Sequence, residues 1–117
     1  MENSFVKKFV KEWAEAWNSH NIDKILSHYT EDFEMSSPII TKLCNEPSGK
    51  LKGKKEIKEY WLKALNLNPN LRFEILSVLT GVKSIIIHYK GHRGLSSEVF
   101  HFNKNNMVTK SYAHYEI

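Results

Sequence analysis

The sequence predicts an α+β fold in which helices pack on one face of a curved, mostly antiparallel sheet. Residues 4–19 place apolar side chains at helical spacing, with lysines and glutamates on the other side. The second half of the chain instead contains short runs with a period of two, separated by Gly and Asn turn residues. Three helices followed by such a sheet bury the concave face of the sheet under the helices.

The 117 residues are expected to form one domain, 1–117, because this length is close to the commonest domain size. The composition is 41% apolar and 26% charged, which is typical of a globular protein. No apolar run approaches the roughly 20 residues that cross a bilayer, and lysines interrupt the N-terminal apolar residues where a secretory signal would be continuous. We therefore expect a cytoplasmic protein with no membrane partner.

Two helices and one strand are expected in the first third of the chain. Asn21 can cap a second helix that runs to Tyr29. Residues 32–37 then alternate, with Phe33, Met35 and Ser37 on one face, and predict a strand that Pro38 ends. The apolar stripe of the first helix comprises Phe5, Val6, Phe9, Val10, Trp13, Ala14, Ala16 and Trp17.

The middle of the chain predicts an irregular crossing followed by a third helix. Residues 39–53 are rich in Pro, Ser and Gly, and a short strand can form at 39–43. Residues 54–65 carry Ile57, Trp61 and Leu65 at helical spacing. The strands that follow are expected at 71–79, 84–90, 97–102 and 108–117.

Composition also argues against several function classes. The basic run at 50–58 has no arginine and no interleaved aromatic residues, so it is a solvated face and no nucleic-acid partner is expected. No Gly-rich phosphate loop and no HExxH run is present, and we expect no cofactor. Cys44 is the only cysteine; it is either a free loop thiol or, beside a suitable base, a nucleophile.

Several short motifs resemble those of the NTF2-like superfamily, and within it the SnoaL-like and ketosteroid isomerase-like branch. The resemblance covers nearly the whole chain and implies a cone-shaped fold around a pocket, with the convex face of the sheet often used for dimerisation. The motifs are Ala16-Trp17-Asn18, Asn21-Ile22-Asp23, Tyr29-Thr30-Glu31-Asp32, Gly53-Lys54-Lys55-Glu56-Ile57 and Glu98-Val99-Phe100-His101-Phe102-Asn103.

The same resemblance implies which parts of the isomerase site this chain has kept. In ketosteroid isomerase an aspartate base moves a proton while a tyrosine and a protonated aspartate bind the enolate oxygen. Ser37 stands at the base position, Trp13 at the tyrosine position and Glu98 at that of the second acid. A serine hydroxyl is no base without an activating partner, and an indole N–H only donates. The resemblance therefore implies a pocket that lacks the steroid isomerase base.

Glu98 is the leading candidate catalytic residue. The alternation of Glu98, Phe100 and Phe102 places its carboxyl on the face expected to be concave, where apolar surroundings would raise its pKa. Alternatively, Glu98 reaches solvent or pairs with Arg93 or Lys90. The residues that could bind a ligand, or simply fill the core, are Trp13, Trp17, Tyr29, Met35, Ser37, Trp61, Ile87, Tyr89, Phe100 and Tyr115.

Three histidines, His88, His101 and His114, come from consecutive strands and share the convex face if their alternation holds. They could meet as metal ligands, but no Asp or Glu joins them on the same face of these strands, and no metal site is predicted. The same face is expected to be too apolar to stay in water, which predicts a homodimer with the histidines in its interface. The apolar residues expected there are Leu76, Val78, Ile86, Val99 and Tyr112. A shift of one residue in the last strand would instead send Tyr112 and His114 inward, where His114 could be a catalytic base.

Two functional hypotheses follow. The first is a SnoaL-like protein with a pocket for a hydrophobic small molecule, acting as a cofactor-free isomerase, cyclase or hydrolase-type enzyme or as a binder. The alternative is a non-catalytic homodimerisation or protein-interaction module. An open cavity with Glu98 directed into it favours the first hypothesis, and a cone filled by aromatic side chains favours the second.

The sequence also predicts that the protein is not a steroid isomerase. Because Ser37 stands where the base is required, an assay with a 5-ene-3-ketosteroid should show only background conversion. The variant Ser37→Asp would gain activity if the remaining pocket is competent. Wild-type turnover that Ser37→Ala abolishes would contradict this prediction.

Overall fold

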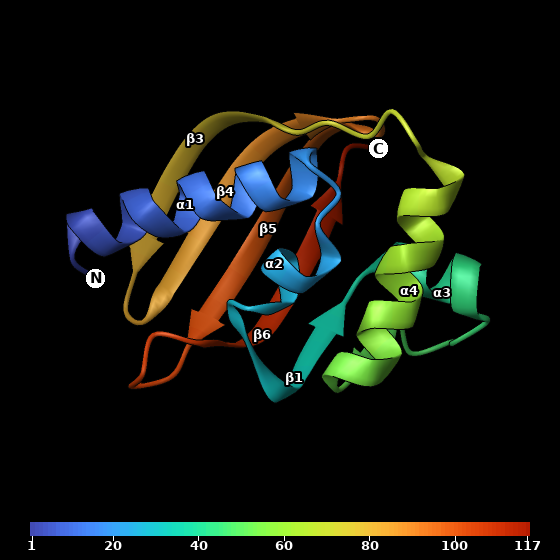
Figure 1. Cartoon of the computed structure of the whole chain (residues 1–117), viewed down its shortest axis with the longest axis horizontal. Helices are drawn as coiled ribbons and strands as arrows, with labels where there is room; N and C mark the ends of the chain where they lie inside the picture. The colour runs from blue at the N-terminus through green and yellow to red at the C-terminus, as the bar shows by residue number, and fades with distance from the viewer.

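The structure, a computed structural model, describes residues 1–117. Figure 1 shows α1 lying across β3, β4 and β5, while α4 lies with α3 at the other end of the sheet, beside β1. The helices are α1 (Asn3–Asn18), α2 (Ile22–Leu26), α3 (Pro38–Cys44) and α4 (Lys54–Leu67). The strands are β1 (Tyr29–Ser36), β2 (Lys50–Lys52), β3 (Glu74–Gly81), β4 (Ser84–Gly91), β5 (Gly94–Phe102) and β6 (Val108–Tyr115).

The six strands form one mixed sheet in the order β2-β1-β6-β5-β4-β3. Only the β1–β6 pair is parallel, and the other neighbours are antiparallel. The predicted α+β class, with helices on a mostly antiparallel sheet, is confirmed. None of the helices has both the length and the apolar character needed to cross a membrane.

The helices form where their apolar stripes and caps indicate. The stripe of α1 is buried against the sheet, and its fully buried members include Phe9 and Trp13. The side chain of Asn21 caps α2 by accepting a hydrogen bond from the backbone N–H of Lys24 at 3.1 Å. Local pattern thus predicts both helices, but α2 ends at Leu26 and does not reach Tyr29. Tyr29 instead begins β1, where it pairs with Val108 of β6, so the first strand starts before residue 32.

The region after Pro38 differs from the prediction. Residues 38–44 form α3 in place of an irregular crossing with a short strand, so the fold has four helices and not three. Ser37 caps α3, because its Oγ accepts a hydrogen bond from the backbone N–H of Ile39 at 3.1 Å, and Pro38 occupies the first helical position. Ser-Pro here starts a helix as well as ending a strand. The short β2, which pairs with β1, was not predicted.

Strand β3 begins later than predicted and contains a bulge. The register of the β3–β4 pair shifts between Ile75 and Ser77, which changes the side of the sheet to which later residues point. Val78 therefore pairs with Ile87 and packs against the core, although alternation places it on the convex face. Leu79 takes that outer position, opposite Ile86.

The concave face of the sheet carries the core. Ile85 and Ile87 of β4 and Phe100 of β5 are fully buried beneath the helices. The register of the central strands also places one charged residue, Glu98, on this face. The functional site is built around it.

Candidate functional site

Glu98 lies in the middle of the sheet, between two apolar neighbours. It pairs with Ile87 on β4 and with Ala113 on β6, and directly opposite residues bring their Cβ atoms to about 5 Å. In the adjacent inward-facing row, Ser96 of β5 lies between Tyr89 and Tyr115. Across the strands, the carboxyl of Glu98 thus has apolar neighbours at its own level and hydroxyl groups at the next inward-facing level.

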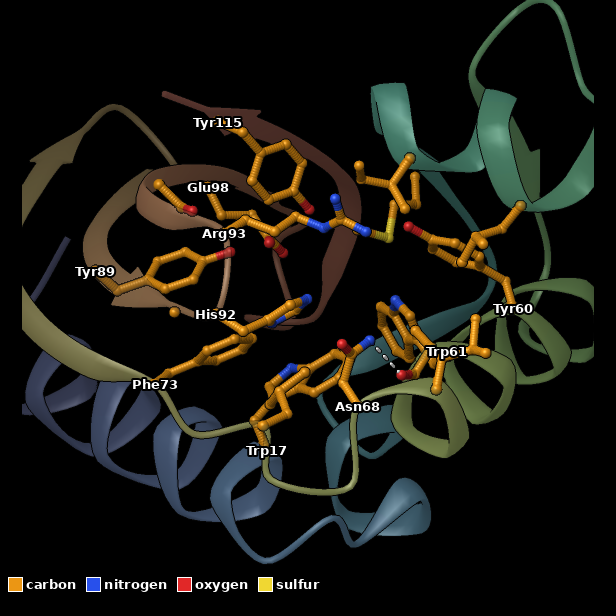
Figure 2. A pocket seen from close by; sticks show the side chains of 18 residues that line it. Trp17, Tyr60, Trp61, Asn68, Phe73, Tyr89, His92, Arg93, Glu98 and Tyr115 are labelled. Atoms are coloured by element: carbon orange, nitrogen blue, oxygen red, sulfur yellow. Dashed lines mark hydrogen bonds between the residues drawn. The ribbon is translucent and has the colours of Figure 1, made fainter. Parts of the chain in front are cut away.

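A cavity opens over this part of the sheet, at the end of the cone near the β4–β5 turn. Its empty space is about 660 Å³, including the part at its open mouth. Figure 2 shows Glu98, Tyr89 and Tyr115 on one side of the cavity, with Trp17, Trp61 and Tyr60 on the helical side. The residues that line it are Trp17, Met35, Ile39, Leu43, Tyr60, Trp61, Ala64, Leu67, Asn68, Leu71, Phe73, Tyr89, Gly91, His92, Arg93, Ser96, Glu98 and Tyr115.

Aromatic rings form a continuous wall of the cavity. Trp61 contacts Trp17 edge to face with ring centroids 5.2 Å apart, Trp17 meets Phe73 at 5.5 Å, and Phe73 meets Tyr89 at 4.6 Å. Such rings provide a rigid apolar surface that holds its shape without a ligand. The wall joins α1, α4 and the sheet.

The segment before β3 is held in place by polar side chains from the end of α1. The amide of Asn18 accepts a hydrogen bond from the backbone N–H of Phe73 at 2.6 Å and donates one to the carbonyl of the same residue at 3.0 Å. The ring of His20 lies 2.8 Å from the carbonyl oxygen of Leu71. These contacts fix Leu71 and Phe73 at the cavity.

The narrow end of the cone is filled. Trp13 stacks on Phe73 with ring centroids 5.4 Å apart and is nearly fully buried, as are Tyr29 and Phe100. The Trp13 indole N–H and the Tyr29 hydroxyl are both buried and neither makes a well-formed hydrogen bond. Aromatic packing therefore closes one end of the cone and leaves the other open.

Burial controls the protonation of Glu98. The residue is only 5% exposed, and desolvation raises the pKa of its carboxyl to about 8. The Tyr89 hydroxyl stabilises the carboxylate and opposes part of this rise. Because this pKa is above 7, the neutral carboxylic acid predominates at neutral pH and can donate a hydrogen bond or a proton.

The tyrosines of the cavity are hydrogen-bond donors at neutral pH. Burial is the main cause that raises the pKa of Tyr60, Tyr89 and Tyr115, and the negative charge of ionised Glu98 raises each further. The Ser37 hydroxyl near Tyr60 and Tyr115 acts in the opposite direction. All three phenols therefore stay protonated near neutral pH, so none is a ready base.

The mouth of the cavity carries the more polar groups. His92 and Arg93 form the tip of the β4–β5 hairpin. Partial burial and the neighbouring Arg93 charge lower the pKa of His92, so its imidazole is neutral at pH 7. Asn68 lies across the mouth, and its amide donates to the carbonyl of Ala64 at 2.9 Å, at the end of α4.

The structure brings about half of the candidate residues to the cavity. Glu98, Trp17, Met35, Trp61, Tyr89 and Tyr115 line it. Trp13, Tyr29, Ile87 and Phe100 are core residues beneath it, and Ser37 is buried as the cap of α3. Glu98 makes no salt bridge with Arg93 or Lys90.

His114 lies outside the cavity. Ser111 and Ala113 of β6 face the core, so Tyr112 and His114 point to the convex side, where His114 is exposed. The strand keeps its alternation here, and His114 is not placed to act as a base on a ligand in the cavity. The other two histidines share this face, but Ser97 separates His88 from His114, and His101 pairs with Ser84 and Lys110.

Sequence reasoning missed several lining residues. Tyr60 lies one residue before Trp61 on α4, and helical periodicity alone does not show that both reach the cavity. Phe73 was expected at the start of a strand, but it lies in the segment that Asn18 holds. His92 was not singled out, and Arg93 was considered only as a possible partner of Glu98. The Gly91-His92-Arg93-Gly94 turn pattern was the available signal, since it marks a hairpin end beside the site.

The fold is that of the NTF2-like, cystatin-like class. The model of the SnoaL-like domain family matches residues 10–110. The chain therefore belongs to the SnoaL-like domain family, and the resemblance seen in the sequence is confirmed. Among proteins with curated descriptions, none is significantly similar to the chain in sequence.

Solved structures support the same assignment. A SnoaL-like protein of unknown function from Burkholderia thailandensis is 48% identical, with a TM-score of 0.95 over 99% of this chain and 98% of that one. A putative polyketide cyclase from Sinorhizobium meliloti is 12% identical, with a TM-score of 0.73 over 92% and 94%. The epoxide hydrolase/cyclase-like enzyme SalBIII, with a role in pyran ring formation in the polyether salinomycin, is 15% identical, with a TM-score of 0.76 over 100% and 95%. The last two show the fold alone.

The raised pKa of Glu98 predicts a specific pH dependence of stability. Between the unfolded pKa, near 4.5, and the folded pKa, about 8, the unfolded chain binds fewer protons, so stability falls as pH rises and levels off above pH 8. From pH 6 to 9 this residue should reduce the free energy of unfolding by about 2–3 kcal/mol, at about 1.4 kcal/mol per pH unit.

Urea unfolding of wild type and Glu98→Gln at several pH values measures this contribution as the difference between the two curves. The control is Glu74→Gln, at an exposed glutamate of β3, which should keep the wild-type profile. Parallel curves for wild type and Glu98→Gln would show that Glu98 does not titrate in this range.

Proposed function

We propose that the protein binds a hydrophobic small molecule in this cavity and that Glu98 acts on it as a general acid. The observation that carries the proposal is the neutral, buried carboxyl of Glu98 beside an open cavity with aromatic walls. A polar atom in an apolar site orients a ligand, because leaving the carboxyl unpaired there is costly. The ligand should therefore present a carbonyl, hydroxyl or ether oxygen to Glu98.

The groups around the cavity favour activation of an electrophile. Protonated Glu98 and the phenols of Tyr60, Tyr89 and Tyr115 are all donors near neutral pH. A site of this kind suits reactions in which an oxygen gains negative charge while the nucleophile comes from the ligand itself or from water. Ring closure, isomerisation and the opening of an epoxide meet this description. The acid–base chemistry of Glu98 requires no cofactor.

The structural neighbours agree with this reaction class without establishing it. Both the putative polyketide cyclase and the epoxide hydrolase/cyclase-like enzyme share the fold, and a fold can support several chemistries. The proposal for this chain therefore depends on Glu98 and its surroundings.

Ligand binding should depend on the protonation of Glu98. With the aryl ketone butyrophenone as probe, quenching of Trp17 and Trp61 fluorescence reports binding at the cavity wall. Wild-type affinity should fall about tenfold or more between pH 6 and pH 9.5, because ionised Glu98 can no longer donate to the carbonyl. Glu98→Gln should bind with an affinity independent of pH, whereas Glu74→Gln should behave as wild type. A wild-type affinity that is constant over this range would contradict the assigned role of Glu98.

Catalysis is tested with an aryl 4,5-epoxy alcohol, which closes to a cyclic ether when its own hydroxyl attacks the epoxide. Protonation of the epoxide oxygen by Glu98 should accelerate closure, and Glu98→Gln should lose about a hundredfold or more of this rate. Equal rates for wild type, Glu98→Gln and buffer would leave the cavity as a binding site only.

We also propose that the convex face joins two copies of the chain. One outward-facing row, Leu79, Ile86, Val99 and Tyr112, crosses four neighbouring strands. Leu79 is 59% exposed and Leu76, in the bulge of β3, is 43% exposed. A contiguous apolar surface of this kind is uncommon on a monomer and suits a self-complementary interface.

Sedimentation velocity at tens of micromolar protein should show a dimer. Val99→Glu should convert it to a monomer, because a two-fold interface would place two buried carboxylates near each other. Lys7→Glu changes charge on the exposed side of α1 and should leave the dimer intact. A monomeric wild type at this concentration would contradict the proposed interface.

A further inference from the structure

The mouth of the cavity continues outwards into a second, more polar hollow, which we call the vestibule. Ile39, Asn68, His92, Arg93 and Tyr115 line both spaces, so the two spaces share one rim. The vestibule adds Pro38 and Lys42 from α3 and Glu116 after β6. Its surface is therefore charged where that of the cavity is apolar.

The hairpin geometry directs Arg93 over this opening. Gly91 pairs with Gly94, so that His92 and Arg93 are the two turn residues. Gly94 has a φ of +88°, a backbone conformation that glycine adopts without strain. In Figure 2 the side chain of Arg93 extends from the turn past Tyr115 and Glu98, towards Tyr60 on α4.

Arg93 has no acidic partner. It takes part in none of the four salt bridges of the protein and in no side-chain hydrogen bond. The nearest acidic residue of the vestibule, Glu116, instead places its Oε1 at 3.4 Å from the backbone N–H of Leu95. The five N–H donors of the guanidinium thus remain available, in a fork that matches a carboxylate.

The charges of the vestibule favour a singly charged anion. Lys42 and Arg93 are positive, Glu116 is negative and His92 is neutral at pH 7, which leaves one net positive charge. The guanidinium can bind a planar carboxylate in two-point contact, and one net positive charge balances a singly charged anion.

The distance to Glu98 limits the size of such a ligand. Gly94 and Glu98 belong to the same strand, and four strand residues span about 14 Å. In Figure 2 the Arg93 side chain extends over the cavity past Glu98, so that one ligand in the cavity can face both groups. The charges of Glu98 and Arg93 shift the pKa of Tyr115 in opposite directions, so the Tyr115 side chain lies within the influence of both groups.

We propose that the ligand is a hydrophobic oxo acid whose carboxylate is bound by Arg93 at the mouth while its carbonyl oxygen faces Glu98. This rests on the proposed function, because it takes the cavity beside Glu98 as the binding site. Arg93 orients the molecule and favours it over uncharged analogues, because only the carboxylate gives the guanidinium a partner of opposite charge. The apolar part of the ligand lies against the wall of Trp17, Trp61 and Phe73.

The test compares two probes that share an aryl ketone. These are 4-oxo-4-phenylbutanoate, which carries a carboxylate, and butyrophenone, which does not. Wild type should bind the oxo acid about tenfold or more tightly than butyrophenone at pH 6.5 and low salt, with an advantage that shrinks as salt is added. Arg93→Gln should remove this advantage, so that the ratio of the two affinities falls to about one. Arg72→Gln, at the other arginine of the chain, which is exposed and outside both spaces, is the matched control.

The outcomes separate this inference from the proposed function. The assignment of Arg93 is wrong if butyrophenone binds in a Glu98-dependent manner but the carboxylate adds no affinity. It is also wrong if Arg93→Gln and Arg72→Gln lose the same amount of affinity for the oxo acid. In both cases the proposed binding site beside Glu98 remains valid. A phosphonate analogue that binds more tightly than the carboxylate through Arg93 would also overturn the choice of anion. If neither probe shows any dependence on Glu98, the proposed function itself fails.

Discussion

The burial of one carboxyl group on the concave face of the sheet determines what this molecule can do. Glu98 lies between Ile87 and Ala113 and is almost fully removed from water, so it remains protonated at neutral pH at a cost to stability that grows as the pH rises. A residue that only filled space there would be apolar. The carboxyl lines the cavity and does not lie in closed core.

The rest of the structure divides the cone into a filled half and an open half. Trp13, Phe100 and Tyr29 pack one end, whereas the other end keeps an open cavity beside Glu98. The boundary is held by Asn18, whose amide makes two hydrogen bonds with the backbone of Phe73 and so fixes one wall of the space. Packing and polar contacts thus preserve a cavity that hydrophobic collapse alone would close.

Much of the fold was predictable because it depends on local patterns. The helical stripe of α1 and the alternation of Ile85, Ile87, Phe100 and Ala113 indicate burial directly, and alternation also placed Glu98 inside. Ser37 and Pro38 were misleading, since the same dipeptide ends a strand and starts a helix. Position in the cone was not predictable from periodicity: Trp13 and Trp17 share one helix face, yet only Trp17 lines the cavity. The position of Arg93 over the cavity was not predictable for a related reason, because a turn sequence does not show in which direction the side chains of the turn point.

The protonation state of Glu98 is the central claim, and NMR titration of its ¹³C-labelled side-chain carboxyl measures it most directly. The resonance can be assigned from its absence in Glu98→Gln. The structure predicts a single titration with a pKa of about 8, so that the carboxyl is largely neutral at pH 7. A pKa at the ordinary glutamate value of about 4.3 would mean that Glu98 is a charged, solvated group, and would contradict the role given to it here.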